Sequence, residues 1–208
     1  MDSIKINKVI LFGDSVIFGA GANHRKQGCG ILLRSFMPEI TVTIKGRNKD
    51  TTRRGLERVK TDILDDKDCT HVIVLFGNND CRLKDIDKPL VSLSEYKENL
   101  KIIIKQIESS NRIPLIANLQ PINSEMFYRA LPEMSKFIVT VGPPHKWQEK
   151  YSIICEEIAS SEEIKLIDIR SALVKYGDDI FAKDGLHPND FGHKIIAQNF
   201  FEALKEFM

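Results

Sequence analysis

A serine that follows a short apolar run near the N-terminus could act as a nucleophile. The run 8–12 is rich in Val, Ile and Phe and stops at Gly13, a pattern that predicts a buried strand rather than a helix. The next residues are Asp14 and Ser15. Open α/β sheets bind ligands at the carboxyl ends of their strands, so this strand would carry Ser15 to such a site. A serine nucleophile also needs a base, a group that orients the base, and donors for an oxyanion.

An acid and an imidazole lie three residues apart near the C-terminus, as Asp184 and His187. His187 could take the proton of Ser15 while Asp184 holds the other ring nitrogen. Gly185 loosens the turn between them, and Pro188 ends it before a helix that Asn189 would cap. Taken alone, His187 also fits a turn histidine that bonds to the backbone.

A third polar segment, Gly77-Asn78-Asn79-Asp80, follows an apolar run in the middle of the chain. Gly77 permits positive φ or a close approach of backbone to a ligand. An asparagine amide is a neutral donor suited to an oxyanion. Taken alone, Asn78 and Asn79 also fit ordinary turn chemistry.

The elements that would position these segments are strands alternating with helices. Later apolar runs occupy 40–44, 71–76, 113–119 and 164–169, and helical periodicity marks 56–63, 93–107, 147–158 and 189–207. Ser92 and Glu95 have the form of a capping box before the second of these helices. Alternation of this kind favours a parallel sheet covered on both faces.

The segment 121–146 is irregular, with prolines at 132, 143 and 144. It carries several apolar residues that look exposed: Met126, Phe127, Tyr128, Met134 and Phe137. A long connection on a rigid sheet is often a lid or a binding loop. A short extra helix packed on the surface fits the same residues equally well.

Length and composition favour a single domain that spans residues 1–208, and they exclude several classes of partner. Thirty Lys plus Arg against twenty-nine Asp plus Glu give a formal charge of +1, so no global field favours nucleic acid. Four scattered cysteines lack the spacing of a zinc site. The sequence shows no signal peptide and no membrane-spanning run, so we expect a soluble, cytoplasmic protein without stable membrane insertion.

Other glycine-rich or histidine-based sites fit less well. Ile17 stands where the nucleophile elbow of α/β-hydrolases has its second glycine. No third glycine completes a dinucleotide motif around 19–24, and no Gly-Lys-Ser/Thr follows a strand. A metal site of Asp184, His187 and His193 matches no known ligand spacing.

Together, the three segments resemble the motif blocks of the SGNH hydrolases, also called the GDSL esterase and lipase family. Gly13-Asp14-Ser15 looks like the nucleophile block, 77–80 like the Gly-x-Asn-Asp block, and 184–187 like the Asp-x-x-His block. The resemblance implies a flavodoxin-like three-layer α/β/α sandwich with about five parallel strands. It also implies a catalytic triad of Ser15, His187 and Asp184, supported by Gly13, Asp14 and Gly77, and no metal or organic cofactor.

The oxyanion hole that the resemblance implies contains the Ser15 N–H, the Asn79 side chain and one further backbone N–H. The family block with a glycine donor aligns with 48–52, where Lys49 replaces the glycine. A backbone N–H survives any substitution except proline, so Lys49 could still donate. An alternative alignment gives the flexible position to Gly46.

These observations predict a serine esterase that hydrolyses a small-molecule carboxyl ester through an acyl-enzyme intermediate. A short-chain acyl ester or a lysophospholipid-like substrate fits the apolar residues of 126–137. An O-deacetylase of an acetylated carbohydrate would use the same machinery, and a non-catalytic binding module is the alternative from another class. The sequence does not determine the oligomeric state.

Overall fold

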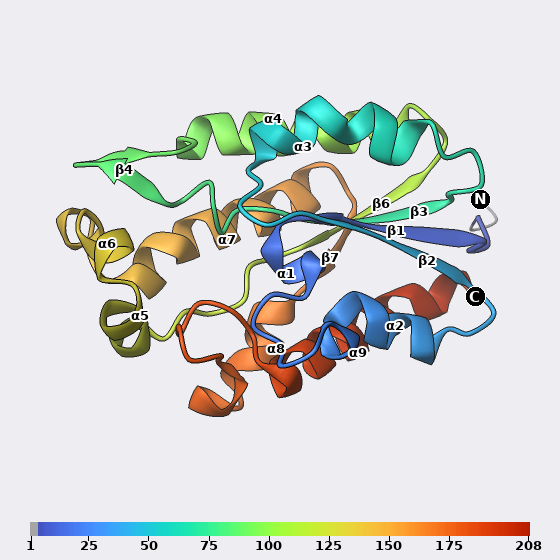
Figure 1. The fold of residues 1–208 in the computed structure, drawn as a ribbon. Helices are drawn as coiled ribbons and strands as arrows, with labels where there is room; N and C mark the ends of the chain where they lie inside the picture. Colours follow the sequence, from blue (N-terminus) through green and yellow to red (C-terminus); the bar gives the residue numbers. More distant parts are fainter. Residues whose placement is uncertain (1–3) are drawn as a thin grey trace.

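The computed structural model describes residues 4–208 and is built on a five-stranded parallel sheet (Figure 1). The strands are β1 (Lys8–Gly13), β2 (Thr41–Gly46), β3 (His71–Leu75), β6 (Ile113–Ala117) and β7 (Lys165–Ile167). Their order across the sheet is β2-β1-β3-β6-β7. The predicted fold, a parallel sheet of about five strands between helical layers, is confirmed.

Helices cover both faces of the sheet, as Figure 1 shows for α3 and α4 above it and α2 and α9 below it. The layer with α3 (Thr52–Val59) and α4 (Leu93–Glu108) also contains α7 (Pro144–Ser161), which packs against α4. The opposite layer contains α2 (Cys29–Phe36), α8 (Ile169–Val174) and α9 (Asp190–Leu204). Both predicted caps are present: Ser92 Oγ accepts from the Glu95 N–H, and Asn189 Oδ1 accepts from the first turn of α9.

Burial explains why the central strands read as continuous apolar runs. Every residue of β3 is buried, and so is all of β1 except Lys8. A strand that is covered on both faces needs apolar side chains on both, so apolar and polar residues do not alternate along it. Phe12 and Phe76 pack edge to face at a ring-centroid distance of 5.1 Å, next to the ends of these two strands.

The chain order creates a crevice at the carboxyl ends of β1 and β3. These strands are neighbours in the sheet, yet β1 leads to α2 on one face and β3 leads to α4 on the other. Ligands of doubly wound sheets bind where the connections diverge in this way. Gly13 allows the two strands to approach closely here, because a Cβ at this position would lie 2.2 Å from the Leu75 carbonyl oxygen.

Two additions lie at the same end of the molecule as the crevice (Figure 1). The segment 121–146 forms α5 (Ser124–Ala130), α6 (Pro132–Ser135) and the 3-10 turn η3 (Ile138–Thr140) before α7 begins. A small antiparallel hairpin, β4 (Leu83–Asp85) and β5 (Lys88–Pro89), follows the Gly77–Asp80 segment and was not predicted. The extra-helix interpretation of 121–146 therefore describes its conformation, and its role as a lid stays a prediction.

Shorter elements complete the described chain. They are α1 (Ser15–Phe18), η1 (Arg25–Gln27), the π-helical turn η2 (Lys60–Leu64) that continues α3, η4 (Gly177–Ile180) and η5 (Lys205–Phe207). Within residues 4–208, every helix is too short or too polar to cross a bilayer.

Candidate active site

Three side chains form a hydrogen-bonded row at the crevice: Ser15, His187 and Asp184. We call these three side chains the reactive row. Ser15 Oγ lies 3.0 Å from His187 Nε2, and His187 Nδ1 lies 2.6 Å from Asp184 Oδ2. The acid and the imidazole thus meet the serine although 172 positions of sequence separate His187 from Ser15. This is the geometry in which a histidine can remove a serine proton while its other nitrogen is held.

The surroundings of Asp184 keep its carboxylate charged. Burial acts to raise the pKa of Asp184, but hydrogen bonds from the His187 ring and from the N–H groups of His187 and Leu186 outweigh it, so the pKa lies below its usual range. An ionised Asp184 accepts the Nδ1–H proton, and this leaves Nε2 of neutral His187 free to accept from Ser15.

Close packing fixes the turn that carries His187. Gly185 adopts φ +66°, and a Cβ there would lie 2.6 Å from Met126 Cβ and 2.7 Å from the Asn123 carbonyl oxygen. Gly21 packs on the other side, where a Cβ would lie 2.7 Å from His187 Cβ. The N-cap and first turn of α5 on one side and the loop after α1 on the other therefore hold this turn in place.

Asp14 supports the segment that carries Ser15 from inside the protein. Its Oδ1 accepts from the Val16 N–H at 2.9 Å, which caps α1, and its Oδ2 accepts from Asn78 Nδ2 at 3.0 Å. Burial raises the pKa of Asp14 to about 6, although both hydrogen bonds act to lower it. Ser15 is the first residue of α1, where a helix leaves its N–H groups without intrahelical partners.

Lys49 and Asn79 face the serine from two further loops. Lys49 has φ +66°, a left-handed conformation that is uncommon for a residue with a Cβ. The next residue, Asp50, accepts a hydrogen bond from Asn79 Nδ2 through its carbonyl oxygen at 2.9 Å. One proton of the Asn79 amide is thus used to hold the Lys49–Asp50 loop, and the other is available to a ligand.

Arg58 joins this loop to β1, the strand that leads to Ser15. The guanidinium is buried and donates to Asp50 Oδ2 at 2.7 Å, to Asp62 Oδ2 at 2.7 Å and to the Gly13 carbonyl oxygen at 2.9 Å. Its planar set of donors suits several acceptors at fixed angles. The end of β1 and the loop before α3 are thereby held at a constant separation.

Gly46 has a different role from the one that the alternative alignment gives it. It is the last residue of β2, and a Cβ there would lie 2.2 Å from the Phe18 backbone nitrogen. The glycine is therefore needed for close packing of β2 under α1. Lys49, by contrast, lines the cleft that contains Ser15.

This cleft has a free volume of about 240 Å³. The residues that line it come from five segments of the chain: Ser15, Ala20, Asn48, Lys49, Asn78, Asn79, Arg82, Met134, Leu186 and His187. A second, apolar pocket lies under η3 and the start of α7. It shares four lining residues with the cleft: Asn78, Arg82, Met134 and Leu186. Its free volume is about 20 Å³, enough for about one water-sized group.

A buried polar network lies behind the cleft. Asn78 Oδ1 accepts from Gln120 Nε2 at 2.9 Å and from Gln148 Nε2 at 3.0 Å, and Gln148 Oε1 accepts from Arg170 at 2.9 Å. Gln120 also donates to the Leu186 carbonyl oxygen at 3.2 Å, next to His187. The network thus connects Asp14, through Asn78, with the histidine turn and with α7 and α8.

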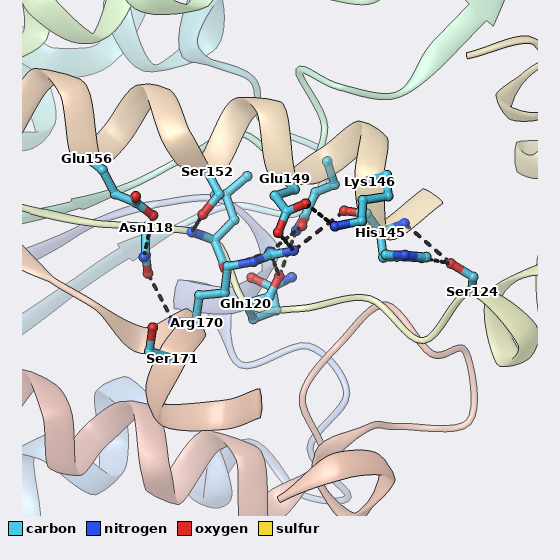
Figure 2. Close-up of polar contacts among 12 residues, drawn as sticks. Asn118, Gln120, Ser124, His145, Lys146, Glu149, Ser152, Glu156, Arg170 and Ser171 are labelled. Atoms are coloured by element: carbon cyan, nitrogen blue, oxygen red, sulfur yellow. Dashed lines mark hydrogen bonds and ion pairs between the residues drawn. The ribbon is translucent and has the colours of Figure 1, made fainter. Parts of the chain in front are cut away.

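Figure 2 shows the outer part of this network, where Arg170 on α8 extends toward Gln120 and the first turn of α7. Its guanidinium lies 3.7 Å from a carboxylate oxygen of Glu149. In the same view His145 Nδ1 lies 2.7 Å from Ser124 Oγ, which ties α5 to α7.

Sequence reasoning missed several residues that support the site: Gly21, Arg58, Gln120, Gln148 and Arg170. Glutamine and arginine in predicted helices or loops look like solvated positions. Only the fold shows that Arg58, Gln120 and Gln148 are buried and that Arg170 is half-buried and hydrogen-bonded. Gly21 carried one signal, its place in a glycine-rich loop shortly after Ser15.

His193 forms part of the scaffold and is separate from the reactive row. It is fully buried, with Nε2 2.9 Å from the Ala20 carbonyl oxygen and Nδ1 accepting from the Cys29 N–H at 3.3 Å. Burial lowers the pKa of His193, which keeps the ring neutral in this role. Among the described residues, no group of three or more His, Cys, Asp and Glu side chains is arranged to hold a metal ion.

Solved structures of esterases share this fold. The lipase/acylhydrolase from Enterococcus faecalis matches with a TM-score of 0.79 and 22% identity over 97% of this chain and 96% of the other. Axe2, an acetylxylan esterase from Geobacillus stearothermophilus, matches with a TM-score of 0.73 and 19% identity over 98% and 96%.

Two curated proteins are similar to this chain in sequence. The GDSL esterase/lipase WDL1 of Oryza sativa subsp. japonica is 26% identical over 95% of this chain and 77% of its own length. The uncharacterized lipoprotein YqeF of Bacillus subtilis is 26% identical over 77% of this chain and 69% of its own length. Residues 11–195 match the GDSL-like lipase/acylhydrolase family, and the stretch runs from inside β1 into α9, which includes all three side chains of the reactive row. The chain therefore belongs to the GDSL-like lipase/acylhydrolase family of carboxylic ester hydrolases.

Proposed function

We propose that Ser15, His187 and Asp184 are the catalytic triad of an esterase that works through an acyl-enzyme intermediate. The observation that carries this proposal is the continuous row from Ser15 Oγ to His187 Nε2, at 3.0 Å, and from His187 Nδ1 to Asp184, at 2.6 Å. All three members of a working triad are present and in contact, which supports an enzyme over a non-catalytic binding module.

In the first half-reaction, His187 Nε2 takes the proton of Ser15 as Oγ attacks the ester carbonyl carbon. The tetrahedral intermediate collapses as the carbon–oxygen bond to the alcohol breaks, and the alcohol leaves with the proton from His187. In the second, His187 takes a proton from water, the hydroxide attacks the acyl carbon, and Ser15 regains its proton as the acid leaves. Asp184 stabilises the imidazolium in both halves.

The oxyanion is held by the Ser15 N–H, the Asn79 side chain and the Lys49 N–H. The Ser15 N–H is at the start of α1, Asn79 has one amide proton to spare, and the left-handed backbone of Lys49 supports the role of a glycine substitute. Fixed donors of this kind need no reorganisation as charge develops on the carbonyl oxygen.

A short acyl group suits this site. The apolar pocket beside the cleft has a free volume of about 20 Å³, which fits the methyl end of a short acyl group. The fold likeness to an acetylxylan esterase favours, as a second candidate, removal of acetyl groups from a carbohydrate.

The test is hydrolysis of p-nitrophenyl acetate and butyrate by wild-type protein and Ser15→Ala. Wild type should show a burst of p-nitrophenol equal to the enzyme concentration, and Ser15→Ala should lose at least about 10³-fold in kcat/KM. Ser94→Ala, at an exposed serine in the first turn of α4, is the matched control and should keep wild-type activity. Full activity in Ser15→Ala would refute the proposal.

A further inference from the structure

Two cationic side chains, Lys49 and Arg82, flank the cleft and are exposed. Within residues 4–208, neither side chain forms an ion pair or a hydrogen bond, whereas Arg53 and Lys97 pair with Glu95 and Glu157. A cation that faces a binding cleft with no counter-charge is free to bind an anionic ligand.

The backbones of both residues are fixed on either side of Asn79. The carbonyl oxygen of Asp50, next to Lys49, accepts from Asn79 Nδ2 at 2.9 Å. The Arg82 N–H donates to the Asn79 carbonyl oxygen at 3.2 Å, and the Arg82 carbonyl oxygen accepts from the Leu90 N–H at 2.8 Å. Only the side-chain stems of Lys49 and Arg82 remain to be ordered when a ligand binds.

Acidic groups near the cleft do not cancel these charges. Among the described residues, none of those that line the cleft has a carboxylate. Asp184 is engaged with His187, and Asp14 is fully buried behind Ser15 with both oxygens hydrogen-bonded. The chain as a whole carries a formal charge of only +1, so the positive character is local to the cleft.

We propose that Lys49 and Arg82 form an anion-binding subsite, and that the ester substrate carries a phosphate or carboxylate group close to its ester bond. This proposal rests on the proposed esterase function and narrows its substrate class. Arg82 presents a planar fork that matches two oxygens of such a group, and Lys49 supplies a point charge. The side chain of Lys49 thus binds the anionic group of the substrate, and its N–H binds the oxyanion.

The first test measures binding and needs no turnover. Calorimetric titration of Ser15→Ala compares two matched pairs of esters. In one pair the charge is on the alcohol: 1-butyryl-glycerol 3-phosphate against 1-butyryl-glycerol. In the other it is on the acyl group: the p-nitrophenyl monoester of succinic acid against p-nitrophenyl butyrate. We expect the anionic member of one pair to bind at least about tenfold more tightly, with the advantage shrinking at high salt. Equal affinity within both pairs would overturn the subsite.

The second test removes each charge in the Ser15→Ala background. Arg82→Gln and Lys49→Gln should each reduce the affinity for the preferred anionic ester by roughly threefold to tenfold, and should reduce the affinity for its neutral partner by clearly less. Lys84→Gln, an exposed lysine on the neighbouring β4, is the matched control and should change neither. If Lys84→Gln has the same effect as Arg82→Gln, the preference for anionic esters arises from the general positive potential of the surface, and the subsite is refuted.

Kinetics with active protein separate the two proposals. Ser15-dependent hydrolysis of the neutral esters with no preference for the anionic ones would refute the subsite and retain the esterase. Tight binding of the anionic esters without any hydrolysis would refute the esterase and retain the subsite as a binding property.

Discussion

Lys49 adopts a left-handed backbone at a position where the family pattern has glycine. This conformation costs a residue with a Cβ roughly 1–2 kcal/mol, which contacts in its surroundings must offset. The compensation is visible at the next residue: Asp50 binds Asn79 through its carbonyl oxygen and Arg58 through its carboxylate. The loop is held at both of these points, which stabilises the left-handed conformation of Lys49.

Substitutions at Lys49 should therefore rank by backbone conformation. For hydrolysis of p-nitrophenyl butyrate, kcat should fall in the order Lys49→Gly, Lys49→Val, Lys49→Pro, because valine resists positive φ and proline both forbids it and removes the donor. We expect Lys49→Pro to lose about 10²-fold or more relative to Lys49→Gly. Equal kcat for the two variants would remove this N–H from the oxyanion hole.

Asn79 should matter in the transition state more than in substrate binding. Asn79→Ala is expected to lower kcat by about 10²–10³-fold with little change in KM, since the lost hydrogen bond strengthens only as the oxyanion forms. Because Asn79 also holds the Asp50 loop, circular dichroism and thermal unfolding of the variant should accompany the kinetics. An unchanged kcat in a folded variant would contradict the role.

At the scale of elements, the histidine turn depends on helices that are distant in sequence. Gln148 on α7 is fully buried and donates to both Asn78 Oδ1 and the Gln120 carbonyl oxygen, while Gln120 binds the carbonyl oxygen of Leu186. Each acceptor or donor that loses its partner inside the protein costs about 1–3 kcal/mol. The network is thus a means of holding α7, the end of β6 and the histidine turn in one arrangement.

Gln148→Leu should break this arrangement. We expect the free energy of unfolding in urea to fall by roughly 2–4 kcal/mol, because Asn78 Oδ1, the Gln120 carbonyl oxygen and the Arg170 guanidinium each lose a hydrogen bond inside the protein. In addition, kcat should fall more than KM rises, because Asn78 and Leu186 adjoin the reactive row. Gln106→Leu on α4, a half-buried glutamine without a side-chain hydrogen bond among the described residues, is the matched control. Stability loss of the same size in both variants would argue against the network.

These elements also mark how far the sequence could predict the structure. The strands, the main helices and the reactive row could be predicted because burial on two faces, helical periodicity and three motif blocks leave local signals. The β4–β5 hairpin has strands of three and two residues, too short for periodicity to reveal. Gln148 and Arg170 could not be found, because their burial results from the packing of α7 and α8 and not from any feature of their own segments.

At the scale of the whole molecule, buried acids make stability depend on pH in an unusual direction. Burial raises the pKa of Asp80 to about 7 and that of Asp14 to about 6, both from an ordinary value of 3.8. The folded protein thus holds these protons at pH values where the unfolded chain has released them, and stability falls as pH rises from about 4 to about 7. His71 acts in the opposite sense, because burial lowers its pKa to about 4 and its contribution is lost as pH falls from about 6.5.

Asp80→Asn isolates one of these opposing effects. Asp80 Oδ1 accepts from the N–H and the hydroxyl of Thr52, which an asparagine oxygen can also do, and Oδ2 has no hydrogen-bond partner within the described residues. Below about pH 4 the acid is protonated in both the folded and the unfolded wild type, so the difference in stability between the variant and the wild type should not change with pH there. As pH rises from about 4 to about 7, the unfolded wild type releases this proton while the folded protein retains it, so the wild type loses stability and the variant does not. The variant should therefore become more stable than the wild type by roughly 2–4 kcal/mol, measured as a growing difference in Tm. Asp68→Asn, at an exposed aspartate, is the matched control for replacing a carboxyl group by an amide. Parallel Tm curves for Asp80→Asn and wild type would mean that Asp80 is ionised throughout this range, with its charge compensated inside the fold.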